Sequence, residues 1–393
     1  MELLLNEEQK ALQMSVRDFC KKEIIPNIDK WNEAGEVPWD LYKKIGQLGY
    51  FGGLFPEEYG GSNMGCLNQA IIIEELTAAW TDASGPYNQL SMSVPMGLYL
   101  YGTEEQKMRY IPGMLAGEFT GCFGLTEPGV GSDAAHLQTR AVRDGDHYVI
   151  NGTKMWITYG TVAKFGIIFA KTDPKAGYNG ITAFLVPFDT PGLSKRKIKC
   201  QIGTKCVPTS ELVFEDVRVP VDAVLGKEGD GFKCAMGELQ FGRITVASRC
   251  VGVARAALET AIRYANERQA FNQPIGKFQM IQRLIADAAT EIEAARYLVY
   301  KAAYLADKGE RFNLEGSQAK LYAAEVCKRA AQACVEVHGA YGVAEEYKAM
   351  YYEQFANMMR TGEGPSNIQR VLIAEHFLGY KDANRHPRKV SAK

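Results

Sequence analysis

The segment "HYVINGTKMWITYG", residues 147–160, decides the fold because its residue composition differs from that of the chain around it. It is rich in β-branched and aromatic residues, which favour strands, and it contains Asn151-Gly152, a pair typical of tight hairpin turns. The runs "KFGIIFAKTD", "GITAFLVPFD" and "SELVFEDVRVP" follow it, divided by Asp-Pro and Pro-Gly turns. These features predict a β domain over residues 121–226, with its strongest hairpin signal at Asn151-Gly152.

Both flanks of this β region have a helical pattern. Before it, apolar residues recur at helical intervals behind Asn6, a candidate N-cap. After it, Ala-, Leu- and Ile-rich stretches such as "ITVASRCVGVARAALETAIRYANERQ" predict a helical bundle. A chain of 393 residues is too long for one core. We therefore expect an α+β protein with an N-terminal helical domain over 1–120, a middle β-barrel-like domain over 121–226 and a C-terminal four-helix bundle over 227–393.

Composition excludes several classes of function. The 45 Lys and Arg residues balance 46 Asp and Glu residues, and a net charge of −1 gives no reason to expect nucleic acid or an anionic membrane as partner. The nine cysteines contain no CxxC pair, which predicts reduced, mostly buried thiols and no metal site. The start "MELLLNEEQK" lacks the basic region of a targeting signal, and no apolar run reaches the length of a membrane span. We therefore expect a cytoplasmic protein.

The usual nucleotide and hydrolase motifs are missing from the sequence. There is no P-loop, and no GxGxxG follows a strand and opens a helix. There is no GxSxG, and the five histidines lie in unrelated contexts. The chemistry must therefore come from other segments.

Two segments of the β region carry candidate binding groups. In "CFGLTEPGVGSD", residues 122–133, hydroxyl residues and glycines follow an apolar strand, so backbone amides and hydroxyls are placed for a large polar ligand, unless the segment is only a polar turn. In "KMWITYG", Trp156 stands beside Ile157 and Thr158. A Trp in this position either packs in a core or walls a flat heteroaromatic ring.

A third segment, "MRTGEGPSN", residues 359–367, interrupts the second helical region. It displays one carboxylate, Glu363, between Gly362 and Gly364, and Pro365 follows. The glycines permit backbone conformations that other residues avoid, and the proline cannot continue a helix. A solvated loop acid and a catalytic acid are both compatible with these residues alone.

Five segments together resemble the signature segments of the flavin-dependent acyl-CoA dehydrogenases. They are "FGLTEPGVGSD", "INGTKMWIT", "ERQAFNQPIGKFQ", "VHGAYG" and "GEGPSNIQR", in this order and over nearly the whole chain. The resemblance implies FAD as cofactor, an acyl-CoA as substrate and an electron-transferring flavoprotein as electron acceptor. It also implies a homotetramer, a dimer of dimers, in which neighbouring subunits share the FAD sites.

The resemblance also assigns roles to individual residues. Glu363 matches the base that removes the α-proton of the thioester, and its own N–H would help to polarise the thioester carbonyl. Residues expected beside the flavin are Phe123, Leu125, Thr126, Ser132, Trp156, Ile157, Thr158, Pro365, Ser366 and Asn367. Residues expected to hold the rest of FAD, partly from a neighbouring subunit, are Arg268, Phe271, Gln279, Glu336, Val337, His338, Gly339 and Ala340. Substrate contacts are expected from Ser132, Tyr87, Leu90, Ser91, Phe241, Arg243, Gly362 and Gly364.

Departures from the family pattern bear on the acyl group. Gly362 stands where the family often has an aromatic residue, and Pro365 stands where a Thr is frequent, so its flavin-side hydrogen bond would have to come from Ser366. The expected acyl wall, "ASGPYNQLSMSVP", has no Lys or Arg to pair with a dicarboxylic chain. We expect a compact, uncharged substrate such as cyclohexanecarboxyl-CoA or a branched short-chain acyl-CoA. Two alternatives stay open: an enoyl-CoA reductase that runs the same chemistry in reverse, and a non-catalytic acyl-CoA or flavin-binding protein.

Overall fold

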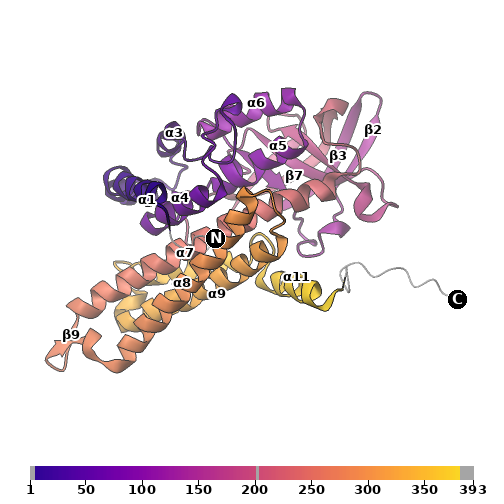
Figure 1. The fold of residues 1–393 in the computed structure, drawn as a ribbon. Helices are drawn as coiled ribbons and strands as arrows, with labels where there is room; N and C mark the ends of the chain where they lie inside the picture. The colour runs from indigo at the N-terminus through magenta and orange to yellow at the C-terminus, as the bar shows by residue number, and fades with distance from the viewer. Residues whose placement is uncertain (1–4, 201–202, 381–393) are drawn as a thin grey trace.

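The order of elements is helical, then β, then helical, as expected from the sequence (Figure 1). The computed structural model describes residues 5–200 and 203–380. Residues 1–4 lie outside these ranges, and they are part of the segment from which the absence of a targeting signal was expected. Residues 381–393, the end of the expected C-terminal domain, also lie outside them. The fold class is confirmed: a mixed α+β architecture with a sheet domain between two helical regions.

From residue 5 onward, the N-terminal region consists of six α-helices with short π- and 3-10 turns between them. Asn6 is confirmed as an N-cap, because its side chain accepts the Gln9 N–H while the Gln9 side chain accepts the Asn6 N–H. A π-helical turn, η4 (Asn88–Met92), follows the Gly85-Pro86 break. The helices are α1 (Glu7–Phe19), α2 (Ile28–Ala34), α3 (Trp39–Gln47), α4 (Cys66–Ala79), α5 (Val94–Tyr101) and α6 (Glu104–Leu115).

The described part of the middle region is one eight-stranded sheet in the order β6-β7-β3-β2-β4-β5-β8, with β1 paired to β4. Most pairs are antiparallel, while β1 and β2 each run parallel to β4. Buried aromatic and β-branched residues from β3, β4, β5 and β7 form its core. The strands are β1 (Gly121–Gly124), β2 (Arg140–Asp144), β3 (His147–Thr158), β4 (Phe165–Lys171), β5 (Ile181–Pro187), β6 (Leu193–Ile198), β7 (Thr209–Pro220) and β8 (Val224–Leu225).

The hairpin predicted at Asn151-Gly152 is wrong. β3 continues through both residues, and the turn that joins it to β2 lies earlier, around Gly145, where Asp144 pairs with His147. Gly152 instead lies at a register shift between β3 and β7, with φ at +146°. A Cβ there would lie 2.6 Å from the Thr139 hydroxyl. The glycine therefore permits a bulge and a close strand contact, which the Asn-Gly pair alone does not distinguish from a turn.

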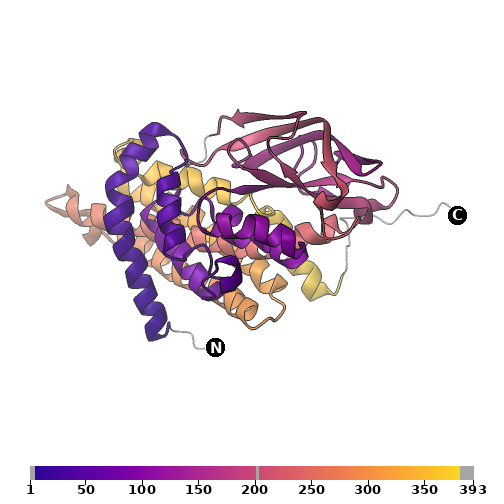
Figure 2. The same ribbon diagram turned by 90° about the horizontal axis from the view of Figure 1, so that it is seen from above.

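The C-terminal region is built on α7 (Gly231–Glu267), which packs against α4, α8, α9 and α10. The β9-β10 hairpin (Gln269–Ala270 and Gln273–Pro274) joins α7 to α8 at the end of the bundle that points away from the sheet (Figures 1 and 2). All nine cysteines are free, and all but Cys200 are buried. The other helices are α8 (Gln279–Asp307), α9 (Asn313–His338), α10 (Ala349–Met359) and α11 (Ser366–Leu378).

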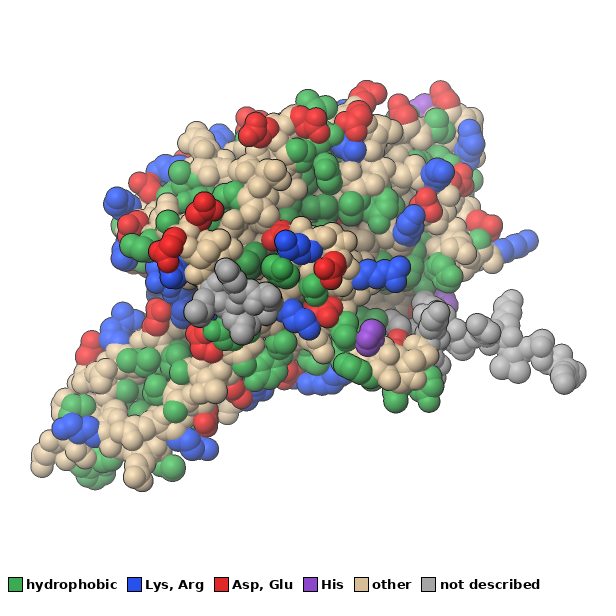
Figure 3. All heavy atoms as spheres, viewed as in Figure 1, with side chains coloured by type: hydrophobic (Ala, Val, Ile, Leu, Met, Phe, Trp, Pro, Cys, Tyr) green, Lys and Arg blue, Asp and Glu red, His purple; other side chains and the backbone are tan. Residues whose placement is uncertain are grey.

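The surface shows acidic and basic side chains interspersed on the face seen in Figure 3. This distribution agrees with the balanced composition of the chain. None of the helices within the described ranges is long and apolar enough to cross a membrane.

Candidate active site

Glu363 lies in the loop between α10 and α11 and has a left-handed backbone conformation, with φ at 55°. Such a conformation is uncommon for a residue with a side chain, and here the surrounding hydrogen bonds hold it. Gln369 Nε2 donates to the carbonyl oxygens of Glu363 and Gly364 at 3.2 and 3.0 Å. Asn88 Nδ2 on η4 donates to Glu363 Oε1 at 2.7 Å. The loop therefore aims a single carboxylate inward, towards η4.

Gly242 on α7 provides the surface against which this carboxylate packs. A Cβ at Gly242 would lie 2.6 Å from Glu363 Oε2 and 2.9 Å from its carboxyl carbon. Any other residue would displace the acid, so the position requires glycine although it lies inside a helix, where glycine costs stability. Glu363 Oε2 is itself buried, with no hydrogen-bond partner among the described residues.

The surroundings of Glu363 give its carboxyl group a pKa that suits a general base. Burial raises the pKa of Glu363 to about 7, against the lowering influence of the nearby cations Arg243 and Lys320 and of the Asn88 hydrogen bond. A base is most effective when its pKa lies near the working pH. The carboxylate is therefore poised to take up and release a proton near neutrality.

The segments expected beside the flavin are joined by hydrogen bonds. The Met155 N–H donates to the Thr126 carbonyl oxygen at 2.9 Å. The buried Lys154 ammonium donates to the Leu125 carbonyl oxygen at 3.2 Å and to Glu127 Oε1 at 2.8 Å. These contacts place the loop after β1 directly beside the end of β3.

Trp156 is not a core residue. It has φ at 63°, and it lies at the register shift between Lys154 and Ile157 with 59% of its surface exposed. Its neighbour Ile157 is buried. The bulge thus turns a flat aromatic side chain outward next to the polar loop that follows β1. An exposed aromatic face beside backbone and hydroxyl groups fits a flavin ring.

The loop that carries Ser132 is open. Ser132 is exposed, and a Cβ added at Gly129 or Gly131 would meet no atom within 4 Å. Phe123 lies partly buried on β1 with its ring centroid 5.0 Å from that of Phe169. The loop therefore leaves room for a large ligand to approach its backbone.

The expected substrate wall lies in the interior. Tyr87, Leu90 and Ser91 are fully buried around η4, next to the Asn88 that contacts Glu363. On α7, Arg243 Nη1 lies 3.4 Å from the Ser317 hydroxyl oxygen. The Phe241 ring packs edge-to-face with the Phe312 ring, with 5.3 Å between the ring centroids. Gly362, next to the acid, is exposed, and a Cβ there would meet no atom within 4 Å.

The second group of expected FAD residues lies elsewhere. The Arg268 guanidinium stands 5.6 Å over the Tyr341 ring, and Phe271 is 89% exposed at the tip of the β9-β10 hairpin. Figure 1 shows this hairpin at the opposite end of the bundle from the sheet. Gln279, Glu336, Gly339 and Ala340 are exposed, but the side chains of Val337 and His338 are buried in their own bundle. A single chain therefore does not bring this group to Trp156.

Several residues that complete the site were not predicted from the sequence. Gly242 and Asn88 shape the surroundings of Glu363, and Lys320 and Glu238 are buried charged residues that interact with it electrostatically. A glycine in mid-helix directly before Arg243 was a detectable signal, because that position normally disfavours glycine. The others are brought close by tertiary packing between helices that lie far apart in the sequence.

Comparison with known families gives the identity. The N-terminal, middle and C-terminal domains of acyl-CoA dehydrogenase match residues 6–118, 122–217 and 229–378. The chain belongs to the acyl-CoA dehydrogenase family. It is therefore an oxidoreductase of the FAD-dependent acyl-CoA dehydrogenases, and the expected cofactor and enzyme class are confirmed.

Relatives match along nearly the whole acyl-CoA dehydrogenase chain. Probable acyl-CoA dehydrogenase YngJ of Bacillus subtilis (strain 168) is 42% identical over 382 residues, covering 96% of this chain and 100% of that protein. The structure of a glutaryl-coenzyme A dehydrogenase in complex with glutaryl-CoA matches with a TM-score of 0.93 and 37% identity over 99% of each chain. A chain from work on the electron transferring flavoprotein of Acidaminococcus fermentans and flavin-based electron bifurcation matches with a TM-score of 0.90 and 37% identity, over 96% of this chain and 100% of that one.

Proposed function

We propose that this acyl-CoA dehydrogenase oxidises a compact, uncharged acyl-CoA to the 2-enoyl-CoA, with Glu363 as the base. The observation that carries the proposal is the Glu363 carboxylate, which packs on Gly242, accepts a hydrogen bond from Asn88 and has a pKa of about 7. A carboxyl group with this pKa is partly ionised at neutral pH, and its ionised form can take the α-proton of a thioester.

The chain's own residues divide the work between the two sides of the site. Glu363 takes the α-proton onto its carboxylate. Its own N–H would donate to the thioester carbonyl oxygen and so polarise the carbonyl group. Trp156, Thr126 and Thr158 would hold the flavin ring on the sheet side. When bound, FAD accepts the hydride that leaves the β-carbon. Enclosure of the site strengthens these polar contacts because water is excluded.

The acyl group is proposed from the walls of the site. Open space at Gly362 admits width beside the reacting carbons. The buried segment around Leu90 and Ser91 has no Lys or Arg of its own, and the nearby Arg249 guanidinium already donates to the Ser84 hydroxyl and the Thr81 carbonyl oxygen. A branched short-chain acyl group or a cyclohexanecarboxyl group fits such a wall better than a dicarboxylic one, because a terminal carboxylate would be buried without a cation. The substrate that we propose for this chain therefore differs from the glutaryl-CoA bound in the similar glutaryl-coenzyme A dehydrogenase.

An electron-transferring flavoprotein is the proposed acceptor, which is supported by the structural likeness to a chain studied with such a flavoprotein. The same likeness supports one alternative, an enoyl-CoA reductase supplied with electrons by that partner. Reduced partner flavoprotein mixed with the enzyme and an enoyl-CoA distinguishes the two directions. Faster turnover of the enoyl-CoA than of the acyl-CoA would favour the reductase.

The test of the base uses the Glu363→Gln variant without oxygen. Purified enzyme mixed with acyl-CoA should lose its yellow flavin absorbance, and Glu363→Gln should bind FAD and acyl-CoA but reduce flavin on the order of 10²-fold more slowly or worse. Glu259→Gln, an exposed change on α7, serves as the matched control and should react normally. Near-normal flavin reduction by Glu363→Gln would contradict the assignment. A spectral shift without bleaching in the unaltered protein would indicate a binding protein.

A further inference from the structure

A second carboxylate lies beside the proposed base and has no role in the reaction described above. Glu238 on α7 is fully buried, and neither of its carboxyl oxygens has a hydrogen-bond partner among the described residues. A buried polar group without a partner costs free energy, and a buried carboxylate costs more. A bound molecule that hydrogen-bonds to the Glu238 carboxyl group would therefore remove this cost.

Glu238 is held in place by packing against Gly97. Its carboxyl carbon packs on α5, where a Cβ at Gly97 would lie 2.5 Å from it. Gly242, which receives the Glu363 carboxylate, follows one helical turn later on the same face of α7. Four residues of helix span about 6 Å. Glu238 therefore lies beyond Glu363 towards α5, on the side where η4 forms the proposed acyl wall.

The charge around Glu238 favours a particular kind of partner. The charged group that acts on Glu238 is Glu363, and together with burial it raises the pKa of Glu238 well above its usual range. The cations Arg243, Lys320 and Arg249 act on Glu363 instead. A terminal carboxylate placed here would put a negative charge near Glu363, which is ionised above pH 7. A hydrogen-bond donor would satisfy an oxygen of Glu238 without that repulsion.

We propose that Glu238 is a specificity-determining residue that binds a hydrogen-bond donor, a hydroxyl or an amine, at the distal end of the acyl chain. This inference rests on the proposed function, because it places the α-carbon at Glu363. A chain that follows α7 from there to Glu238 covers about four carbon–carbon bonds. The same contact disfavours a terminal carboxylate, which separates this enzyme from one that acts on glutaryl-CoA.

Four acyl-CoAs of equal chain length test the proposal. Pentanoyl-, 5-hydroxypentanoyl-, 5-aminopentanoyl- and glutaryl-CoA share a five-carbon acyl group and differ only at its end. For each, kcat/KM is measured from flavin reduction by the FAD-loaded enzyme. Kd is measured by titration of the Glu363→Gln variant, in which chemistry is slowed but binding remains. The variants are Glu238→Leu, which removes the carboxyl group, and Glu238→Gln, which keeps its shape and polarity.

We expect the hydroxyl or the amine chain to exceed pentanoyl-CoA by about 10-fold in both kcat/KM and affinity, the scale of one net hydrogen bond. Glutaryl-CoA should be the poorest of the four. Glu238→Leu should abolish the preference, and Glu259→Gln should leave it unchanged. A preference for the hydroxyl that survives in Glu238→Gln identifies a neutral donor. A preference for the amine that is lost in Glu238→Gln identifies a cation, which would replace the uncharged acyl group proposed above.

Other outcomes would overturn the inference. These are a wild-type enzyme that prefers pentanoyl- or glutaryl-CoA, or a donor preference that persists in Glu238→Leu. If Glu238→Leu does not fold, the wild-type series and Glu238→Gln still decide. If all four compounds bind but none reduces the flavin, the proposed function fails, while the order of the Kd values still tests Glu238 separately.

Discussion

At the scale of the residue, the site depends on how one carboxylate is held. Glu363 combines a left-handed backbone, a glycine surface beneath its carboxyl group and a hydrogen bond from a distant helical turn. The sequence predicts the acid and the flanking glycines, because both are local. Gly242, Asn88 and Lys320 could not be predicted as its neighbours, because they come from α7, η4 and α9, respectively, and meet only in the folded chain.

The first prediction at this scale concerns pH. Because the pKa of Glu363 is about 7, its carboxylate is largely protonated below pH 7 and ionised above it. A base acts only when ionised, so kcat/KM for flavin reduction should rise with pH through about 7 and then level off. Stopped-flow measurement of flavin reduction between pH 5 and 9 checks this. A profile that is flat through neutrality would contradict the role of Glu363.

Lys320 offers a sharper version of the same test. Its buried ammonium lowers the pKa of Glu363, so Lys320→Met should move the midpoint of the profile upward, on the order of one unit. A mutation that only damages packing would lower the rate at every pH without moving the midpoint. Lys328→Met, on the same helix and paired with Glu353, is the matched control and should keep the wild-type midpoint.

At the scale of the element, the proposed flavin-binding surface depends on one buried ion pair. Lys154 on β3 reaches across to Glu127 in the loop after β1, and Glu127 also accepts the Thr139 hydroxyl and the Gln138 and Thr139 N–H groups. Burial lowers the pKa of Lys154 to about 8, while Glu127 opposes this shift. The pair therefore holds the β1 loop beside Trp156.

Removal of only one partner should be costly. Lys154→Met leaves the Glu127 carboxylate buried without its cation, a loss of about 3–5 kcal/mol in stability. FAD retention should fall with it, because the loop beside Trp156 is released. Thermal unfolding and the FAD content after gel filtration measure both effects. The double variant Glu127→Gln/Lys154→Met should recover part of the stability, and a double variant as unstable as Lys154→Met would show that the unpaired charge is not the cause.

The strands themselves show which local signals are reliable. Runs of β-branched and aromatic residues locate β3, β4, β5 and β7, because a pleated, half-buried surface selects these residue types. The Asn-Gly pair misleads, because a glycine with positive φ serves a bulge as well as a turn. The bulge at Trp156 could not be predicted, because its register shift is a property of the pairing of β3 with β7.

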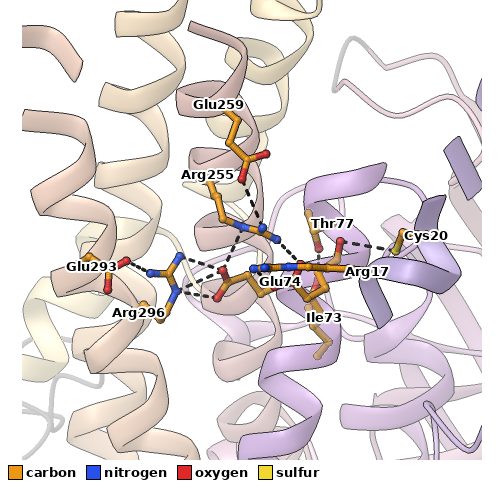
Figure 4. Close-up of polar contacts among 10 residues, drawn as sticks. Arg17, Cys20, Ile73, Glu74, Thr77, Arg255, Glu259, Glu293 and Arg296 are labelled. Carbon is orange, nitrogen blue, oxygen red and sulfur yellow. Dashed lines mark hydrogen bonds and ion pairs between the residues drawn. The ribbon is translucent and has the colours of Figure 1, made fainter. Parts of the chain in front are cut away.

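At the scale of the whole molecule, a buried ionic network joins the N-terminal helices to the bundle (Figure 4). Glu74 on α4 accepts from Arg296 on α8 at 2.9 Å and lies 3.3 Å from Arg255 Nε on α7. Glu75 pairs with Arg255 and with Arg17 on α1. The network therefore links four helices from two regions of the chain.

Glu74→Gln tests the contribution of this network. The change leaves two largely buried guanidinium groups short of an anion, and the melting temperature should fall by about 5 °C or more. Glu293 also pairs with Arg296 but is 56% exposed, so Glu293→Gln is the matched control and should shift the melting temperature by only about 1–2 °C. Equal shifts in the two variants would mean that burial of the network adds no stability.

The separation of the two groups of FAD residues leads to the last prediction. Trp156 lies on the sheet, whereas Arg268 and the exposed Phe271 lie at the far end of the bundle (Figure 1). Both groups serve one FAD only if a second subunit supplies the second group, which is our reason to propose at least a dimer with shared FAD sites. An arginine in this role would bind the pyrophosphate through paired donors.

Arg268→Ala should therefore weaken FAD retention and subunit association together. Sedimentation velocity gives the oligomeric state and absorbance gives the FAD content of the same sample. Added FAD should restore the oligomer, because a ligand that binds across an interface stabilises the assembled state by mass action. Arg311→Ala, an exposed arginine between α8 and α9, is the control and should change neither quantity. Loss of FAD from an intact oligomer that added FAD does not affect would place the whole cofactor site within one chain.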